Sequence, residues 1–223
     1  MIGADFYRLV TELLEPGLAE RGWQVSDRAV YSQQFADGVA RCALDPGRGF
    51  ERFRVMIGFD PPDIVALLDS LFGDELSPSN NRGFLTPPYL TPAGVFRRHS
   101  GYGCRTRQHM AAAATQVLRA MDAHAQPWLA QLRDPQVFAS LADPVAALVT
   151  GYAWERAGHP DRAREFYEEM WRRLEGGLVG LTPAKLQRIE VSTKRMYLFV
   201  ADRLGRHDAV CAVFERDLGR AAG

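Results

Sequence analysis

The sequence predicts an α+β protein in which a small antiparallel sheet with covering helices is followed by an all-helical C-terminal part. Apolar residues have helical spacing over residues 4–21, and short aromatic and β-branched segments replace this pattern up to residue 59. From residue 105 the spacing is helical again, and proline follows a polar residue at several predicted helix starts. We therefore divide the chain into an α+β unit, residues 1–104, and a helical unit, residues 105–223, that packs on the first.

The N-terminal stretch predicts a helix and then a meander of strands. Within residues 4–21, Pro16 and Gly17 predict a kink or a split. The following short segments are separated by Ser-Asp, Asp-Gly and Asp-Pro-Gly turn signals. They predict a three- or four-stranded antiparallel meander over residues 23–25, 29–35, 39–44 and 53–59.

A helix is expected directly after the last of these strands. Asp60 is placed to cap it, Pro61 would occupy its first position, and Asp63 would lie in its first turn, where a carboxylate is favourable. These structural roles explain both aspartates, so we do not interpret them as paired carboxylates for acid–base chemistry. The helix should run to Phe72, and Gly73 should end it.

The rest of the chain predicts an irregular segment and then helices. Residues 74–104 are rich in proline and glycine, and we expect an edge strand near residues 95–99. The helical pattern that begins at residue 105 predicts a break at Pro127, and residues 160–174 carry a single apolar stripe. Later helices are expected to begin at Asp134-Pro135, Asp143-Pro144, Thr182-Pro183 and, with a weaker cap, His159-Pro160.

Composition argues against several classes of protein. The chain of 223 residues is 47% hydrophobic and 24% charged, which is typical of a folded globular protein. Its net charge is zero, whereas general nucleic-acid binders and cationic membrane-surface proteins carry a basic excess. Three scattered cysteines do not form a disulfide framework, and neither a targeting segment nor a membrane span is recognisable. We predict a soluble cytoplasmic protein.

The C-terminal half contains a pattern typical of paired helices. A small residue, an aromatic residue, a turn glycine, a close-packing alanine and a second aromatic residue follow one another at Gly151, Trp154, Gly158, Ala163 and Tyr167. In this order they resemble the tetratricopeptide repeat. The chain departs from that repeat at Thr150, Met170 and Glu175, and a partial second copy follows after 47 residues instead of the usual ~34. The alternative interpretation is an ordinary helix bundle with well-capped helices.

A second resemblance covers most of the chain. A first helix is followed by Gly22-Trp23, by Tyr31 and Phe35, by the strand FRVMIGFD, by a helix that ends in QPWLAQLRD and by a helical hairpin. This order resembles an uncharacterised bacterial α+β domain family of unknown function. The resemblance implies an α+β fold with a helical tail, and it implies no catalytic residue.

The densest polar cluster lies in residues 97–109, just before a predicted helix start. Arginine forks and the free N–H groups of a helix start can both bind an anion such as phosphate. The candidate anion-binding residues are Arg97, Arg98, His99, Tyr102, Arg105 and Arg107, and the tyrosine is expected to be exposed. The alternative is a solvated loop whose arginines pair with acidic residues elsewhere.

The same segment also contains His99, Cys104 and His109. Their spacing is not a standard zinc arrangement and lacks a fourth ligand, and a cysteine–histidine nucleophile would need a third orienting group. We therefore predict no metal, no cofactor and no catalytic residue.

These observations favour a non-catalytic cytoplasmic protein of a bacterium, of adaptor or immunity type, whose partner is another protein. The alternative is a ligand- or nucleotide-handling enzyme that uses the Arg-rich segment at 97–109 as an anion site. Neither general nucleic-acid binding nor membrane binding is expected.

Overall fold

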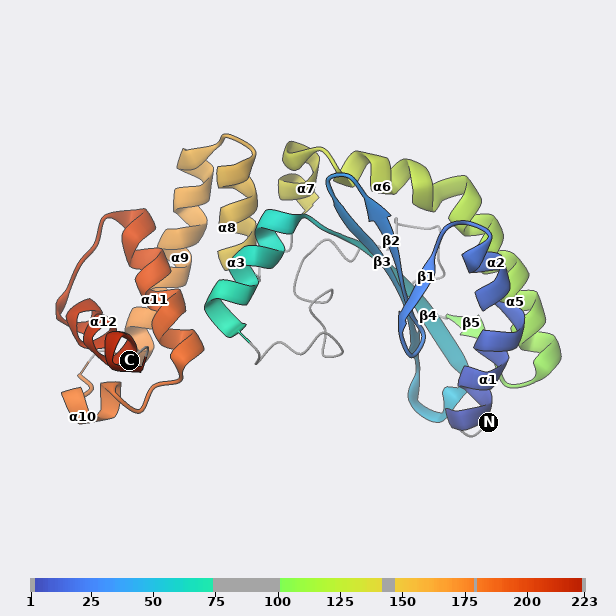
Figure 1. Ribbon diagram of the computed structural model, residues 1–223, viewed down its shortest axis with the longest axis horizontal. Coiled ribbons are helices and arrows are strands. Elements are labelled where there is room, and N and C mark those ends of the chain that lie inside the picture. The colour runs from blue at the N-terminus through green and yellow to red at the C-terminus, as the bar shows by residue number, and fades with distance from the viewer. Residues whose placement is uncertain (1–2, 74–100, 142–146, 179, 222–223) are drawn as a thin grey trace. The chain divides into compact units, whose positions relative to one another are not determined.

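The protein has an α+β fold, in which a five-stranded antiparallel sheet with helices precedes a mostly helical C-terminal region (Figure 1). The computed structural model describes residues 3–73, 101–141, 147–178 and 180–221. The chain forms two compact units, Met1–Pro62 with Thr86–Phe138, and Asp63–Leu85 with Ala139–Gly223. Within the described residues, no helix combines the length and apolar character that crossing a bilayer requires.

The sheet is the meander that the sequence predicts, with one further strand. Its order follows the chain, and every neighbouring pair is antiparallel. The edge strand predicted near residues 95–99 lies outside the described residues. The strands are β1 (Gln24–Asp27), β2 (Val30–Phe35), β3 (Gly38–Pro46), β4 (Arg52–Asp60) and β5 (Tyr102–Gly103).

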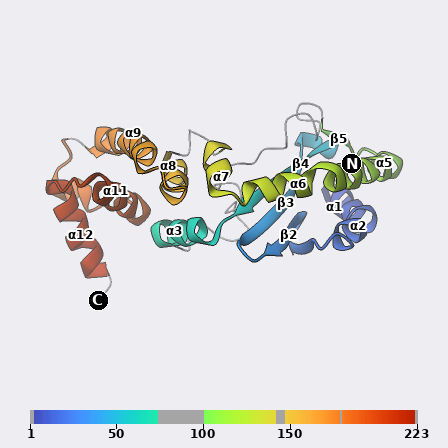
Figure 2. The ribbon, with the colours of Figure 1, turned by 90° about the horizontal axis from the view of Figure 1, so that it is seen from above.

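Helices α1 (Gly3–Leu13), α2 (Glu15–Ala19) and α5 (Arg107–Ala120) cover one face of this sheet (Figures 1 and 2). The strand register places Tyr31, Cys42 and Ile57 side by side, and all three are buried. The ring of Phe6 on α1 packs 5.8 Å from the ring of Phe53 on β4. The core of the first unit therefore lies between this sheet face and its helices.

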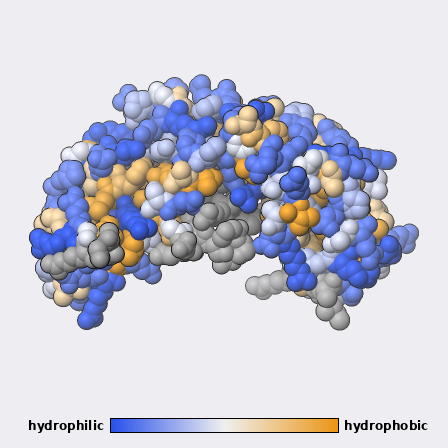
Figure 3. Space-filling view, in the orientation of Figure 1, coloured by the Kyte–Doolittle hydropathy of each residue, from blue (hydrophilic) through white to orange (hydrophobic). Residues whose placement is uncertain are grey.

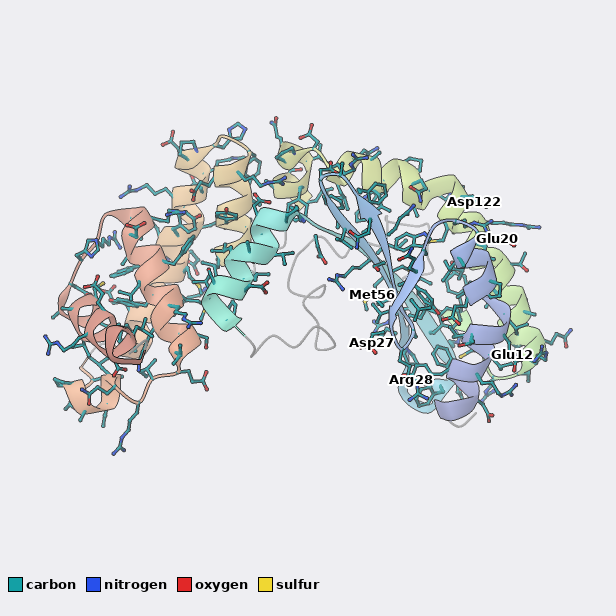
Figure 4. The ribbon with its side chains drawn as sticks, in the orientation of Figure 1. Glu12, Glu20, Asp27, Arg28, Met56 and Asp122 are labelled. Atoms are coloured by element: carbon teal, nitrogen blue, oxygen red, sulfur yellow. The ribbon has the colours of Figure 1, made fainter. Side chains whose placement is uncertain are left out.

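The predicted split of the first helix is confirmed. The helix α1 ends at Leu13, and α2 carries Pro16 in its first turn, where the missing N–H leaves no hydrogen bond unmade. A Cβ atom at Gly17 would overlap the Leu118 side chain of α5, so glycine allows these two helices to approach closely. After α2, the guanidinium group of Arg21 donates to both carboxylate oxygens of Asp122, at 2.6 and 2.7 Å (Figure 4).

The break predicted at Pro127 takes a different form. The helix α5 continues through a π-helical segment, Met121–Ala125, directly into α6 (Gln126–Leu132), so the backbone stays helical. Proline lacks an N–H group, and its ring collides with the carbonyl group four residues earlier in a regular α-helix. The wider π turn before Pro127 relieves this conflict.

The structure tests two of the predicted helix caps, at Asp134 and at Asp60. Asp134 caps α7 (Pro135–Leu141) as predicted, because its carboxylate accepts a hydrogen bond of 2.8 Å from the backbone N–H of Gln136. The expected cap at Asp60 is wrong. The helix α3 (Pro62–Phe72) begins one residue later than predicted, and Asp60 is the last residue of β4, where its buried carboxylate pairs with Arg41 of β3.

The second unit contains two helical hairpins whose turns have the same geometry. The first joins α8 (Ala147–Arg156) to α9 (Pro160–Leu178), and the second joins α11 (Val191–Leu204) to α12 (Ala209–Ala221). Gly158 and Gly205 end the first helix of each hairpin at φ values of 80° and 65°. The same backbone hydrogen bond of 2.9 Å closes both turns, from His159 to Trp154 and from Arg206 to Ala201. The start predicted at Asp143-Pro144 lies outside the described residues.

A short helix, α10 (Pro183–Leu186), precedes α11, and a buried lysine ties this region together. The ammonium group of Lys194 on α11 pairs with the carboxylate of Asp217 on α12 and donates to the backbone carbonyl of Gln187, 2.8 Å away. Because the carboxylate balances the charge and the two contacts accept two of its three N–H hydrogens, the lysine can be 3% exposed inside the unit.

The first hairpin depends on a close approach at Gly151. A Cβ atom at this position would lie 2.8 Å from Cε1 of Tyr167 and 3.2 Å from Cβ of Phe166, which is closer than side chains tolerate. Glycine at residue 151 therefore allows α8 and α9 to pack at this distance.

Replacing Gly151 with alanine should destabilise the hairpin by about 1–3 kcal/mol, because the added methyl group overpacks the contact with Tyr167. Gly176→Ala in α9 is the matched control, since a Cβ there meets no atom within 4 Å and alanine favours a helix by about 0.5–1 kcal/mol. Urea unfolding followed by circular dichroism measures both variants. Equal unfolding midpoints would contradict this account of Gly151.

Candidate functional site

Three of the six predicted anion-binding residues, Tyr102, Arg105 and Arg107, lie in the part of the chain that the structure describes. Arg97, Arg98 and His99 lie outside the described residues. Tyr102 was expected to be exposed and is instead 5% exposed, because β5 pairs with β4 and sets its ring 5.5 Å from that of Phe53. Arg105 and Arg107 remain, on either side of the start of α5.

Arg105 and Arg107 line a hollow on the surface of the first unit. Thr106 caps α5 between them, and its hydroxyl oxygen accepts a hydrogen bond of 3.2 Å from the backbone N–H of His109. Arg8 of α1 contributes a third guanidinium group. The hollow has a volume of about 240 Å³ and is lined by Asp5, Arg8, Leu9, Arg105, Thr106 and Arg107.

Carboxylates pair with every arginine of this hollow. Arg107 pairs with Glu12, and Arg8 donates to the same carboxylate at 2.8 Å (Figure 4). Arg105 pairs with Glu51, and Asp5 lies 3.8 Å from Arg8. Hydrogen bonds from Arg107 and Arg8 lower the pKa of Glu12, so this carboxyl group stays ionised at neutral pH.

The three positive charges of the hollow are therefore balanced by three negative charges. An incoming phosphate would compete with Asp5, Glu12 and Glu51 for the same guanidinium groups. The arginine side chains are 56%, 64% and 62% exposed at Arg8, Arg105 and Arg107, and ion pairs this exposed contribute little in water. The arrangement resembles the solvated, acid-paired segment that the sequence left open as the alternative.

Cys104 lies in surroundings that suppress thiol reactivity. Its side chain is fully buried, and its Sγ atom donates to the backbone carbonyl of Phe50 at 3.2 Å. Burial raises the pKa of Cys104 to about 11, whereas a nucleophilic cysteine needs a lowered pKa. His109 is exposed in the first turn of α5, and His99 is not among the described residues. In that described part of the chain, no three histidine, cysteine, aspartate or glutamate side chains form a metal-binding cluster.

A second candidate surface lies on the helical hairpins. We define the α8–α11 face by Tyr152, Glu155 and Arg156 of α8 and by Phe199 and Arg203 of α11. The rings of Tyr152 and Phe199 are 6.4 Å apart, and the Arg203 guanidinium group lies 4.6 Å above the Phe199 ring. Arg203 also donates to Glu155 at 2.9 Å, which fixes the arginine over the ring.

Charged groups near Tyr152 affect the pKa of its hydroxyl group. Burial raises the pKa of its hydroxyl group, and the negative charges of Asp63 and Glu155 raise it further, against smaller opposite effects of Arg203 and Arg156. Tyr152 and Phe199 are both half-buried. The face thus combines partly exposed aromatic rings with oriented charges.

Arginine also stacks on aromatic rings elsewhere on the hairpins. Arg162 lies 4.5 Å above the ring of Trp154, and Arg206 lies 5.5 Å above the ring of Trp171 while pairing with Glu168 at 2.8 Å. Such contacts contribute about 0.5–1 kcal/mol at exposed sites. They keep flat guanidinium groups at defined places on the surface.

The sequence contains a signal for the α8–α11 face. An aromatic residue, an acid and an arginine occur as Tyr152, Glu155 and Arg156, and the same order returns 47 residues later. The second set is Phe199, Asp202 and Arg203. In both sets the aromatic residue, the acid and the arginine lie six, three and two residues before the turn glycine, which is Gly158 in the first hairpin and Gly205 in the second.

The fold and these surfaces define an α+β protein that carries two similar helical hairpins. No family model matches the chain, and no curated protein or solved structure matches it either. The two resemblances noted in the sequence therefore stay predictions.

The three thiols of the folded protein should be unreactive toward Ellman's reagent at mildly alkaline pH, because Cys42, Cys104 and Cys211 are all buried. Burial also raises the pKa of Cys42 to about 12, so very little of this thiol is ionised to the reactive thiolate at mildly alkaline pH. In concentrated guanidinium chloride all three should react. Rapid reaction of any thiol in the folded protein would contradict this prediction. If the reacting thiol were Cys104, that residue would become a candidate nucleophile.

Proposed function

We propose that this protein is a non-catalytic, cytoplasmic, protein-binding protein of adaptor or immunity type in a bacterium, and that it binds its partner through the α8–α11 face. One observation carries the proposal. An aromatic residue and an arginine of this face occur at equivalent positions of two hairpins, and the two aromatic rings lie 6.4 Å apart, so one face presents two similar pairs of side chains.

The chemistry of the face suits recognition of a protein. Tyrosine and arginine are enriched among the residues that contribute most to protein–protein binding, and aromatic rings supply contact area at a low cost in side-chain entropy. Glu155 holds Arg203, and Arg203 covers Phe199, so these groups are ordered before a partner arrives. A partner would cover the half-buried rings and meet charges of both signs.

The tetratricopeptide-like pattern supports the same proposal. Helical hairpins that stack on one another present an extended surface on which binding residues recur once per hairpin. The spacing of Tyr152 and Phe199 agrees with such a recurrence, although 47 residues separate them.

The alternative function is a ligand- or nucleotide-handling enzyme whose anion site includes Arg105 and Arg107. The hollow beside α5, with three guanidinium groups around it, favours this alternative. The carboxylates of Asp5, Glu12 and Glu51 oppose it, because they already occupy the positions from which an anion would accept hydrogen bonds.

The binding test is an affinity capture of the tagged protein from a lysate of its own organism, with mass spectrometry of the captured proteins and small molecules. A partner bound in stoichiometric amount should lose at least about tenfold in affinity, near 1.4 kcal/mol, when Tyr152 or Arg203 is replaced by alanine. Arg172→Ala is the matched control, because Arg172 is 69% exposed on α9 and pairs only locally with Glu169 in the contacts described. Unchanged affinity in both face variants, with unchanged melting temperatures, would contradict the proposal.

A titration with inorganic phosphate separates the two functions. The NMR signals of the Arg105 and Arg107 side chains follow the titration. The proposed function predicts that these signals show no saturable binding of phosphate. The alternative predicts saturable binding that disappears when both arginines are replaced by alanine. A phosphate-bearing metabolite retained in the capture experiment would likewise support the alternative.

A further inference from the structure

Carboxylates of the second unit hold both arginines of the α8–α11 face. Arg156 pairs with Asp63, in the first turn of α3, at 2.7 Å, and Arg203 pairs with Glu155 at 2.9 Å. The two arginine side chains are 22% and 33% exposed. A guanidinium group that is partly withdrawn from water is costly to leave without an acceptor or an opposite charge. For these two arginines the same unit supplies both.

Arg195 lies beside the same face and has no such partner. It stands on α11 one helical turn before Phe199, and Arg203 stands one turn after that ring, so the three residues share one side of the helix. Arg195 is half-buried, and among the described residues no ion pair, hydrogen bond or ring contact involves its guanidinium group. Arg162 and Arg188 also have no carboxylate partner in that part of the chain, but both are exposed to water.

The charge of Arg195 borders on apolar surface. A Cβ atom on Gly73, at the end of α3, would lie 3.5 Å from one of the guanidinium nitrogens of Arg195, which places the charge beside α3. In the space-filling view, apolar side chains gather over the part of the helical unit where α3 and α11 lie (Figure 3). A charge beside apolar groups is less hydrated than one in open water, so a carboxylate that pairs with it there is bound more strongly. Arg195 thus offers an unsatisfied positive charge next to the rings of the face.

We propose that the partner of the α8–α11 face presents an acidic segment, in which a glutamate or aspartate pairs with Arg195 and a neighbouring apolar side chain covers Phe199 and Tyr152. The inference rests on the proposed function of that face. A guanidinium group can hold both oxygens of one carboxylate. The single turn between Arg195 and Phe199, about 5–6 Å between Cβ atoms, sets the separation of the acidic and the apolar group. The arginines of the hollow beside α5 differ, because a carboxylate already pairs with each of them.

Two short peptides test the selection for acidic residues. The full chain is titrated with a peptide of alternating glutamate and leucine and with its counterpart of alternating glutamine and leucine, and the NMR signals of the Arg195 side chain and the Phe199 ring follow both titrations. The acidic peptide should bind at least about tenfold more tightly, because hydrogen bonds from a guanidinium group to a carboxylate are roughly twice as strong as those between neutral groups. Equal affinities of the two peptides would overturn the proposal.

Arg195→Gln removes the charge and should abolish the preference for the acidic peptide. Arg162→Gln is the matched control, because Arg162 on α9 stacks on Trp154 and has no described carboxylate partner either. An equal loss of affinity in both variants would indicate unspecific attraction to arginine and overturn the proposal. The free Arg195→Gln protein should unfold at the same urea midpoint as wild type, since no described ion pair is broken. A large fall in that midpoint would show that the chain itself supplies the acceptor, which would also overturn the proposal.

The captured partner separates this inference from the function of the face. A partner that depends on Tyr152 and loses at least about tenfold in affinity with Arg195→Gln supports both. A partner that depends on Tyr152 but binds wild type and Arg195→Gln equally leaves the binding function in place and overturns the acidic segment. If no partner depends on Tyr152, the binding function itself fails, and the inference fails with it.

Discussion

The carboxylate of Glu155 is the junction on which the hairpin surface depends. It stands on α8, and it accepts hydrogen bonds from the Tyr167 hydroxyl of α9 at 2.7 Å and from Arg203 of α11 at 2.9 Å. Burial and this contact raise the pKa of Tyr167, so its hydroxyl remains a donor at every physiological pH. Without the carboxylate, the buried Tyr167 hydroxyl group would lose its acceptor at a cost in desolvation, whereas Arg203 would keep its contact with Asp202. Three helices are thus aligned through one charged group.

The elements that follow from local physical chemistry could be predicted from the sequence, and those that depend on register could not. Alternation and turn residues predict the meander, and left-handed glycines at 158 and 205 end helices as expected. The sequence favours Asp60 as a helix cap because two prolines follow it. Its actual partner, Arg41, lies on the adjacent strand, and only the pairing of β3 with β4 brings the two together. The sequence predicts an exposed Tyr102, because a strand of two residues among glycines leaves no periodic pattern.

In the candidate sites too, local features could be predicted from the sequence, whereas contacts between distant segments could not. Sequence reasoning placed Arg105 and Arg107 at a helix start, which is correct, but their carboxylate partners at residues 51 and 12 come from distant segments. The sequence therefore offers acid pairing only as an alternative, and it does not identify Glu51 and Glu12 as the partners. The α8–α11 face had a sequence signal in the spacing of 47 residues, yet only the packing of the helices shows that Tyr152 and Phe199 meet.

The buried ion pair of Lys194 has a practical consequence for the chemistry of the folded surface. The chain contains two lysines, Lys185 and Lys194, and the second is enclosed by Asp217 and a backbone carbonyl. Lys185 is exposed on α10, a short helix that contacts α12. An acylating reagent therefore meets one lysine side chain on the native protein, so a dye or a cross-linker attached through lysine marks a single, known position beside the last helix. Because arginine supplies the other basic side chains, Lys185 is the one exposed lysine, and the α-amino group is the further amine that such a reagent can reach.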